Sequence, residues 1–218
     1  MLIRVELHCH TDASSDSLLS LPNLLKTCQR KKIDKVAITD HNTIQNALLA
    51  QKIAPEKIIV GEEILTCQGE LLAFFVKEEI PAGMDALETI KELRQQGAFI
   101  SISHPYDHFR KGHWQETDLM QIADLVDGIE VFNARCIMNH HNFQAQTFAS
   151  KHTLIPTVGS DAHSALEVGQ AYHIMEEFQD VQGFHNAIRQ SKTYTRLSPS
   201  WVHLLSRYAK WKNSSRNA

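Results

Sequence analysis

The chain has 218 residues and a mass of 24.7 kDa, and 43% of its residues are hydrophobic, which predicts one domain with a substantial core. The formal net charge of -3 and the pI near 6.5 argue against a protein that holds long nucleic acid by phosphate neutralisation alone. No apolar run reaches the length of a membrane span and no signal-peptide pattern is present, so we expect a cytoplasmic protein without a membrane partner. The four cysteines form no CxxC pair, which argues against a zinc ribbon or a disulfide framework. The oligomeric state stays open.

Short apolar runs alternate with amphipathic segments along the chain. The runs predict strands at 2–7, 35–39, 57–64, 70–76, 98–103, 127–133, 153–160 and 170–175. The segments between them predict helices at 22–32, 43–52, 84–96, 116–124, 139–151 and 181–190, with Gly97 expected just past the end of the third. Such alternation is typical of βαβ units in a largely parallel sheet, open or closed into a barrel. The exception is 57–64 with 70–76, whose five-residue connection LTCQG favours an antiparallel hairpin.

The C-terminal segment differs in composition from the rest. We assign residues 1–195 to a catalytic α/β barrel and residues 196–218 to a basic helix or tail packed on it. This tail has no acidic residue and contains Arg196, Arg207, Lys210, Lys212 and Arg216. The simpler interpretation is a terminal helix docked on the body through Trp201, Leu204, Leu205 and Tyr208. The alternative is a basic surface that attracts anionic substrates.

Polar residues that bind metal ions follow six of the apolar runs, each time at the C-terminal end of the run. In a parallel sheet or barrel these ends meet at one rim, where such folds place their chemistry. Residues remote in sequence are therefore expected to share one pocket. The groups are His8-Cys9-His10, Asp40-His41, Glu62-Glu63, His104-Pro105, Glu130 and Asp161-Ala162-His163.

Local spacing also favours shared ligands. Side chains alternate in an extended segment, so His8 and His10 are expected on one side and Cys9 in the core. The same alternation predicts that Asp161 and His163 point together. Together with His8, His10, Asp161 and His163, the strand ends also offer His41, His104, Asp16, Asp40 and Glu63. These are more side chains than the four ligands of one tetrahedral ion. Two or three bridged divalent ions fit better, and mixed histidine and carboxylate ligands suit Zn, Mn or Fe.

The remaining histidines of the chain are interpreted as surface or hydrogen-bonded residues. His108 and His113 are the ones most open to another role, because their loop follows the strand end at His104. This loop, PYDHFRKGHWQ at 105–115, is where we place substrate choice, with His108 as a candidate substrate contact.

At this point six motifs in order, HCHTDASSDS, ITDHNT, GEEI, SHP, IEVFN and GSDAH, resemble the PHP family, the polymerase and histidinol phosphatase domain. The resemblance covers about residues 5 to 175. It implies a distorted (β/α)7-type barrel, a centre of two or three metal ions at the C-terminal rim, and hydrolysis of phosphate esters.

Matched residue by residue, the resemblance implies a set of metal ligands: His8, His10, Asp16, His41, Glu63, His104, Asp161 and His163. Glu62 falls outside this set, and Asp12 is interpreted as a loop residue. One position departs from the family pattern. Gly69 is followed by Glu70 where many members have histidine, and a glutamate there can still bind a metal.

The same matching suggests roles around the ions. Glu130 and Asn133 would line the pocket and bind substrate, and Arg135 would neutralise a substrate phosphate. Asp40 would orient a histidine ligand or, as the alternative, carry a proton to the leaving group.

The predicted function is hydrolysis of a small phosphomonoester or nucleotide by a metal-activated water. One alternative is a nuclease or exonuclease that acts on short nucleic acid. Another is a non-catalytic metal-binding accessory protein, which the nearly complete ligand set disfavours. A structural zinc site fits less well still, because such sites are closed sets of four ligands that usually include cysteine.

Overall fold

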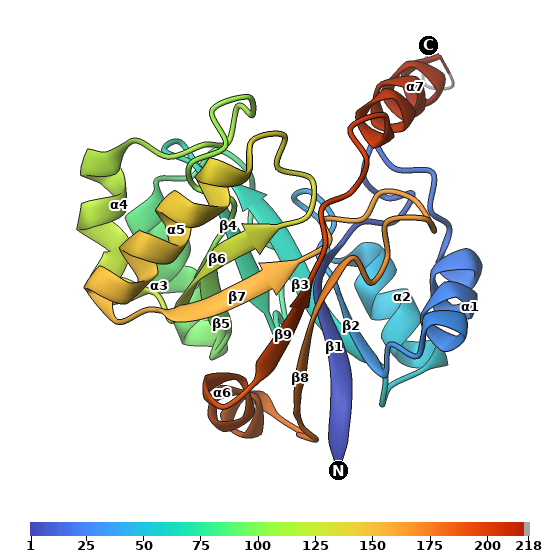
Figure 1. The fold of residues 1–218 in the computed structure, drawn as a ribbon, viewed down its shortest axis with the longest axis horizontal. Coiled ribbons are helices and arrows are strands. Elements are labelled where there is room, and N and C mark those ends of the chain that lie inside the picture. Colours follow the sequence, from blue (N-terminus) through green and yellow to red (C-terminus); the bar gives the residue numbers. More distant parts are fainter. Residues whose placement is uncertain (216–218) are drawn as a thin grey trace.

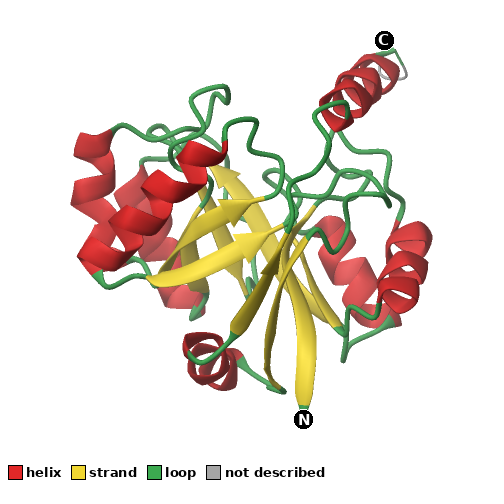
Figure 2. Cartoon of the chain, viewed as in Figure 1, coloured by secondary structure: helices red, strands yellow, loops and turns green. Residues whose placement is uncertain are grey.

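The computed structural model describes residues 1–215, and its centre is a strongly curved sheet with helices on the outside (Figures 1 and 2). Nine strands pair in the order β7-β6-β5-β4-β3-β2-β1-β8-β9. Their bounds are β1 Leu2–Cys9, β2 Lys35–Ile38, β3 Ile58–Leu65, β4 Glu70–Phe74, β5 Phe99–Ile102, β6 Gly128–Asn133, β7 Ile155–Gly159, β8 Ala171–Glu176 and β9 Lys192–Thr195. β9 is the one of these strands that the apolar runs did not predict.

The sheet curls until the end of β7 meets the end of β1. A parallel bridge joins Cys9 to Ala162, and the His10 N–H donates to the Ala162 carbonyl at 2.8 Å. Gly159 permits this approach, because a Cβ there would lie 2.3 Å from the Cβ of His8. The result is a nearly closed, distorted α/β barrel, which confirms the predicted fold class.

Two strand directions interrupt the parallel order. β4 runs antiparallel to β3 and β5, so the predicted hairpin is confirmed. β8 runs antiparallel to β1, and β9 antiparallel to β8. Every other pair in the sheet is parallel, so the C-terminal ends of β1, β2, β3, β5, β6 and β7 share one rim.

Six of the helices match the predicted segments, and a seventh lies in the tail. They are α1 Leu21–Lys31, α2 Gln45–Ile53, α3 Ala86–Gln96, α4 Glu116–Ile122, α5 Asn139–His152, α6 Val181–Arg189 and α7 Val202–Ser214, with a 3-10 turn at Ala123–Leu125. Gly97 ends α3 with a left-handed φ of 76°, as predicted, and Asp85 caps its start by accepting the Leu87 N–H at 3.0 Å. None of the helices within residues 1–215 combines the length and apolarity needed to cross a membrane.

The core has two main parts, and β1 contributes to both. Ile3, Val5 and Leu7 belong to a buried cluster in which Phe184 of α6 packs edge-on against Phe74 and Phe99 of the sheet. Cys9 is fully buried in the other cluster, between the sheet and the outer helices. The predicted core position of Cys9 is therefore confirmed. Polar side chains lie at the C-terminal rim of the barrel.

The tail forms a helix, but the predicted docking face is wrong. Trp201, Leu204, Leu205 and Tyr208 are 47%, 62%, 38% and 51% exposed. Small residues on the other side, Val202 and Ala209, are buried instead. Ser206 and Asn213 join α7 to the body through hydrogen bonds with Arg135 and with the Ser15 carbonyl. Arg216 of the predicted basic set lies outside the described residues.

His173 on β8 gives the fold a testable pH dependence. Its ring is fully buried, accepts the Val158 N–H at Nε2 and donates from Nδ1 to Ser191 Oγ. Burial lowers the pKa of His173 to about 3, whereas the same side chain in the unfolded chain has a pKa near 6.5. Between these two pH values His173 is neutral in the folded chain and protonated in the unfolded chain. The stabilising effect is complete above pH 6.5 and is lost as the pH falls toward 3.

Lowering the pH from 7.5 to 5 should therefore reduce the wild-type free energy of unfolding by about 2 kcal/mol through His173. Urea denaturation at the two pH values measures this change. His173→Gln should remove that component of the pH dependence. Equal pH slopes for the two proteins would contradict the assignment.

Candidate metal centre

All nine residues predicted to bind metal lie together at the C-terminal rim of the barrel. Eight of them form four overlapping groups in which the ligand atoms lie within 4.8 Å of one another. The groups are His10 with His41 and His163; His8 with His10 and Glu63; His8 with His104 and Asp161; and His41 with Glu63 and Glu70. The ninth, Asp16, places its Oδ1 3.3 Å from His163 Nε2 and 3.6 Å from His41 Nε2.

His8 and His10, at the end of β1, direct the same atom toward the centre. His8 Nδ1 donates to Glu130 Oε1 at 2.8 Å, because a carboxylate only accepts. The Ser14 hydroxyl donates to Asp40, so it accepts from His10 Nδ1 at 3.2 Å. In its neutral form each ring therefore keeps a lone pair on Nε2, and these two nitrogens lie 3.1 Å apart.

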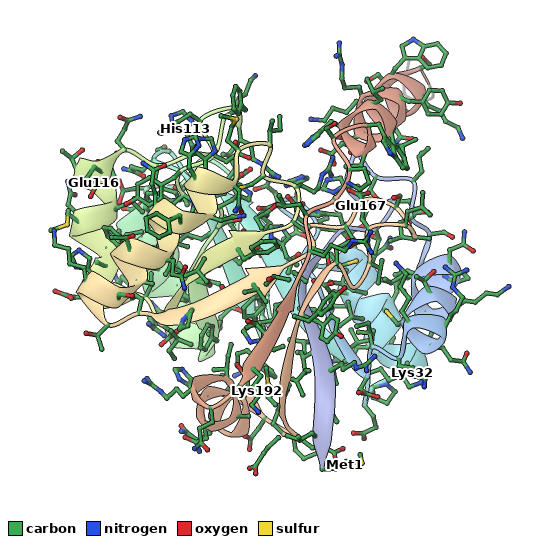
Figure 3. The ribbon with its side chains drawn as sticks, viewed as in Figure 1. Met1, Lys32, His113, Glu116, Glu167 and Lys192 are labelled. Carbon is green, nitrogen blue, oxygen red and sulfur yellow. The ribbon has the colours of Figure 1, made fainter. Side chains whose placement is uncertain are left out.

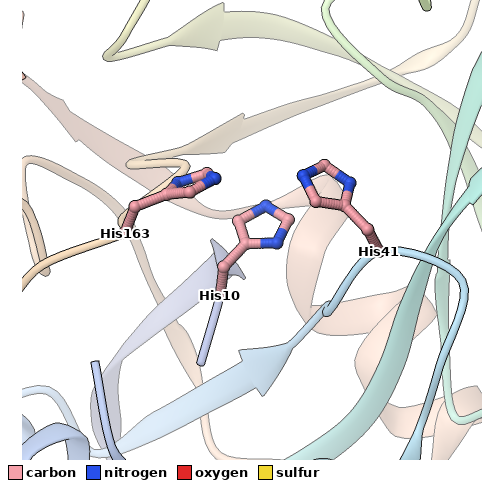
Figure 4. A group of neighbouring side chains, drawn as sticks. All are labelled: His10, His41 and His163. Carbon is pink, nitrogen blue, oxygen red and sulfur yellow. The ribbon is translucent and has the colours of Figure 1, made fainter. Parts of the chain in front are cut away.

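His163 and His41 extend the group from two other loops. Figure 4 shows their rings turned toward the ring of His10. His163 Nδ1 donates to the Asp161 carbonyl at 2.8 Å, which again leaves Nε2 free for a ligand. Fixed tautomers of this kind are typical of histidines that bind metal.

Glu63 lies at the middle of the cluster. Its Oε1 is 2.9 Å from His104 Nε2 and 3.3 Å from His8 Nε2, and its Oε2 is 3.0 Å from His41 Nδ1 and 3.3 Å from His10 Nε2. Both oxygens of Glu63 thus face histidine nitrogens of the cluster. The preceding residue, Glu62, points to the other face of β3 and accepts the Ile80 N–H at 3.1 Å.

Glu70, at the start of β4, stands at the edge of the same cluster. Its Oε2 lies 3.5 Å from His104 Nε2, and it is grouped with His41 and Glu63. The side chain packs over Gly112, where a Cβ would come within 2.1 Å of the carboxylate. Glu70 thus occupies a place from which it can bind an ion, in spite of its departure from the family pattern.

Asp161 and His163 converge by a different route from the one the spacing predicts. β7 ends at Gly159, and Asp161 has a left-handed φ of 52°, so the segment is not an extended strand. Aspartate is one of the few residues that adopt this conformation readily. The premise of strand alternation is therefore wrong here, although both side chains reach the cluster.

Three predicted residues lie beneath the cluster and hold it in place. Glu130 contacts His8 with one oxygen and accepts the His104 N–H at 3.0 Å with the other. The Asn133 amide donates to Glu130 at 3.0 Å and to Asp161 at 3.2 Å. Asp40 accepts from the Thr11 N–H and from the Ser14 hydroxyl, each at 2.6 Å. Glu130 and Asn133 are buried beside the cluster, where their contacts orient His8, His104 and Asp161; a contact of either residue with substrate stays a prediction.

The arginine that reaches the cluster is Arg110, not Arg135. Arg110 Nη2 lies 2.6 Å from Asp161 Oδ2, and its Nε is 3.0 Å from Asp107. Arg135 donates to Ser206 Oγ at 2.8 Å and lies 3.4 Å from Glu167, which is labelled below α7 in Figure 3. Sequence reasoning identified the loop 105–115 without selecting Arg110 within it. In this loop His108 is exposed and packs against His113 and His141.

The electrostatic environment separates the ionised groups from the neutral ones. Burial alone would raise the pKa of Glu63, but His8 and His41 outweigh it and hold that pKa well below its ordinary value. Burial likewise opposes ionisation of Asp161, yet Arg110 and His8 keep its pKa well below the usual range. Burial and the neighbouring rings lower the pKa of His10, which favours the neutral imidazole that binds metal.

The residues fit divalent cations. Buried ligand atoms in the described chain lack hydrogen-bond partners at the centre of the cluster, namely Asp16 Oδ1, Glu63 Oε2 and Asp161 Oδ1. Unpaired buried carboxylate oxygens are costly, and a cation between them and the free Nε2 atoms would satisfy them. Oxygen and imidazole donors without thiolate suit Zn, Mn or Fe.

The neighbours Glu62 and Glu63 provide a matched test of this centre. Glu63→Gln should lose at least one bound ion per chain, measured by elemental analysis after loading with Zn²⁺ or Mn²⁺ and dialysis. Glu62→Gln should keep the wild-type content, because burial raises the pKa of Glu62 to about 8 and the amide replaces a protonated carboxyl. Equal metal content in the two variants would exclude Glu63 as a ligand.

Comparison with known proteins agrees with this geometry. A family described as PHP-associated matches residues 139–193. The uncharacterized protein MJ0417 of Methanocaldococcus jannaschii is 37% identical over 173 residues, covering 78% of this chain and 69% of that protein.

Two solved structures share the fold at low sequence identity. One is a two-domain protein from Bacteroides vulgatus that contains a predicted PHP-like metal-dependent phosphoesterase, with a TM-score of 0.72, 19% identity, and coverage of 90% of this chain and 65% of that one. This chain thus spans slightly less than two thirds of that protein. The other is a lesion-specific endonuclease from Pyrococcus furiosus, with a TM-score of 0.60, 14% identity, and coverage of 88% and 58%. With the sequence motifs, the PHP-associated match over residues 139–193 and the barrel in agreement, the chain belongs to the PHP family.

Proposed function

We propose that this protein is a metal-dependent hydrolase of phosphate esters, acting on a small phosphomonoester or a nucleotide with two or three divalent ions. The observation that carries the proposal is the set of anchored histidines. His8, His10 and His163 each donate from Nδ1 to a protein acceptor, so their Nε2 atoms converge on buried carboxylate oxygens that accept no hydrogen bond within residues 1–215. A structural zinc site would need only four ligands, and this cluster offers nine.

Divalent ions bound there would supply Lewis acidity and would lower the pKa of water enough to provide a hydroxide nucleophile near neutral pH. The protein's own groups would orient and balance this chemistry. Glu130 and Ser14 hold the rings of His8 and His10, and Asp40 holds Ser14. Asp40 is fully enclosed by these contacts, which supports orientation over proton transfer to a leaving group.

Arg110 is the cation best placed to meet a substrate phosphate. It is one-fifth exposed and already pairs with a carboxylate of the cluster, Asp161. A cation that binds Asp161 competes with that ion pair, and the guanidinium fork is then available for phosphoryl oxygens.

A second candidate is hydrolysis of short nucleic acid. The outer face of α7 favours it, because Trp201, Tyr208 and Trp211 are 47%, 51% and 66% exposed and bases stack on such rings. Phosphate release from mononucleotides and cleavage of a short labelled oligonucleotide, measured side by side, distinguish the two substrates.

The metal-loaded protein should release phosphate from at least one ester among sugar phosphates, histidinol phosphate, mononucleotides and nucleoside bisphosphates, with loss of activity on chelation and recovery with Mn²⁺ or Zn²⁺. His41→Ala and Asp161→Ala should lower kcat/KM at least roughly 100-fold, the upper end of what loss of a supporting partner costs a metal site. His185→Ala is the control, since His185 on α6 pairs with Asp127 away from the cluster. Wild-type turnover by folded His41→Ala and Asp161→Ala proteins would refute the proposal.

A further inference from the structure

The C-terminal helix α7 presents one polar face to the metal centre. His203, Ser206, Lys210 and Asn213 follow at intervals of three, four and three residues, which places them on one side of a helix. Ser206 accepts from Arg135 at 2.8 Å, and the Asn213 amide donates to the Ser15 carbonyl at 2.9 Å. These contacts hold α7 beside the loop that carries Asp16, on the rim side of the barrel (Figure 1).

Lys210 is the residue of this face that reaches the cluster. Its Nζ lies 3.4 Å from Asp16 Oδ2, while Asp16 Oδ1 faces His163 and His41. The Lys210 side chain is 62% exposed, whereas that of Asp16 is 11% exposed. The ammonium thus stands where the buried cluster opens to solvent, at the end of a flexible side chain.

A purely structural role explains this position poorly. An ion pair of this exposure contributes little to stability, and α7 has its own anchors in Ser206, Asn213 and the buried Val202 and Ala209. A cation bound by Asp16 would also compete with Lys210 for the same carboxylate. The ammonium would then be left beside the centre as a free positive charge, which suits a phosphate oxygen.

The composition of α7 agrees with a role in anion binding. Its residues 202–214 include three basic side chains and no acidic one, in a chain of net charge -3. The match to the PHP-associated family ends at residue 193, before this helix begins.

We propose that Lys210 is a substrate-binding residue of this enzyme, whose ammonium contacts the phosphate of the bound ester on the Asp16 side of the metal centre. The inference rests on the proposed phosphoesterase function. It makes α7 one wall of the substrate site and assigns the tail a part in selecting phosphorylated substrates.

The test compares Lys210→Gln with Lys212→Gln, which removes the same charge from the opposite side of α7. Two readouts are taken on metal-loaded protein: the steady-state constants for the best ester of the screen, and the binding of inorganic phosphate by calorimetry. Lys210→Gln should raise KM and weaken phosphate binding roughly tenfold, the loss expected for one charge-assisted hydrogen bond, with kcat within about twofold. Lys212→Gln should match the wild type in both, and metal content should be equal in all three proteins.

Equal KM and equal phosphate affinity in the two variants would overturn the inference. Loss of bound metal from Lys210→Gln would also overturn it, because Lys210 would then support the centre rather than the substrate. Phosphate binding requires no turnover, so it tests Lys210 even if no ester is hydrolysed. Absence of hydrolysis by the wild type would count against the proposed function alone.

Discussion

The buried carboxylate of Glu63 is the group on which the architecture of the centre depends. A charge removed from water is costly unless it is closely compensated, and this one is surrounded by His8, His10, His41 and His104. These rings come from the ends of three different strands, β1, β2 and β5, and they can surround Glu63 on β3 only because the sheet curves into a barrel. The bridge between Cys9 and Ala162 completes the curve and brings Asp161 and His163 to the same place. The curvature of the sheet therefore brings the residues of the site together.

Around this centre a layer of buried hydrogen bonds decides which atoms face inward. Glu130, Ser14 and the Asp161 carbonyl each accept a hydrogen bond from an Nδ1–H, and the Nε2 atoms are left to converge. Asp40 and Asn133 in turn hold Ser14 and Glu130. Because these hydrogen bonds already orient the side chains, metal ions can bind without a further free-energy cost of reorienting them. This explains why so many polar groups are buried at this end of an otherwise apolar barrel.

The sequence predicted the parts of this arrangement that follow from local chemistry. Histidine and carboxylate groups directly after apolar runs must lie at strand ends, and the parallel order of most strands then puts them on one rim, so His8, His41 and Glu63 were found without a structure. The conformation of Asp161 was not predictable, because its left-handed backbone depends on the meeting of β7 with β1. Arg110 was not predictable for a similar reason, since only the path of its loop turns its guanidinium toward Asp161, while Arg135 turns toward Ser206. For α7, large apolar residues suggested the docking face, but the helix packs through small ones such as Ala209.

We propose that these side chains form one multinuclear metal centre. The most direct measurement is anomalous diffraction from crystals grown with Zn²⁺ or Mn²⁺, recorded on both sides of the absorption edge of the added metal. We predict at least two anomalous peaks, both within coordination distance of Glu63 and each also in contact with a histidine Nε2 of the cluster. A map with no peak among these residues, or with peaks only at exposed histidines such as His108, would contradict the claim.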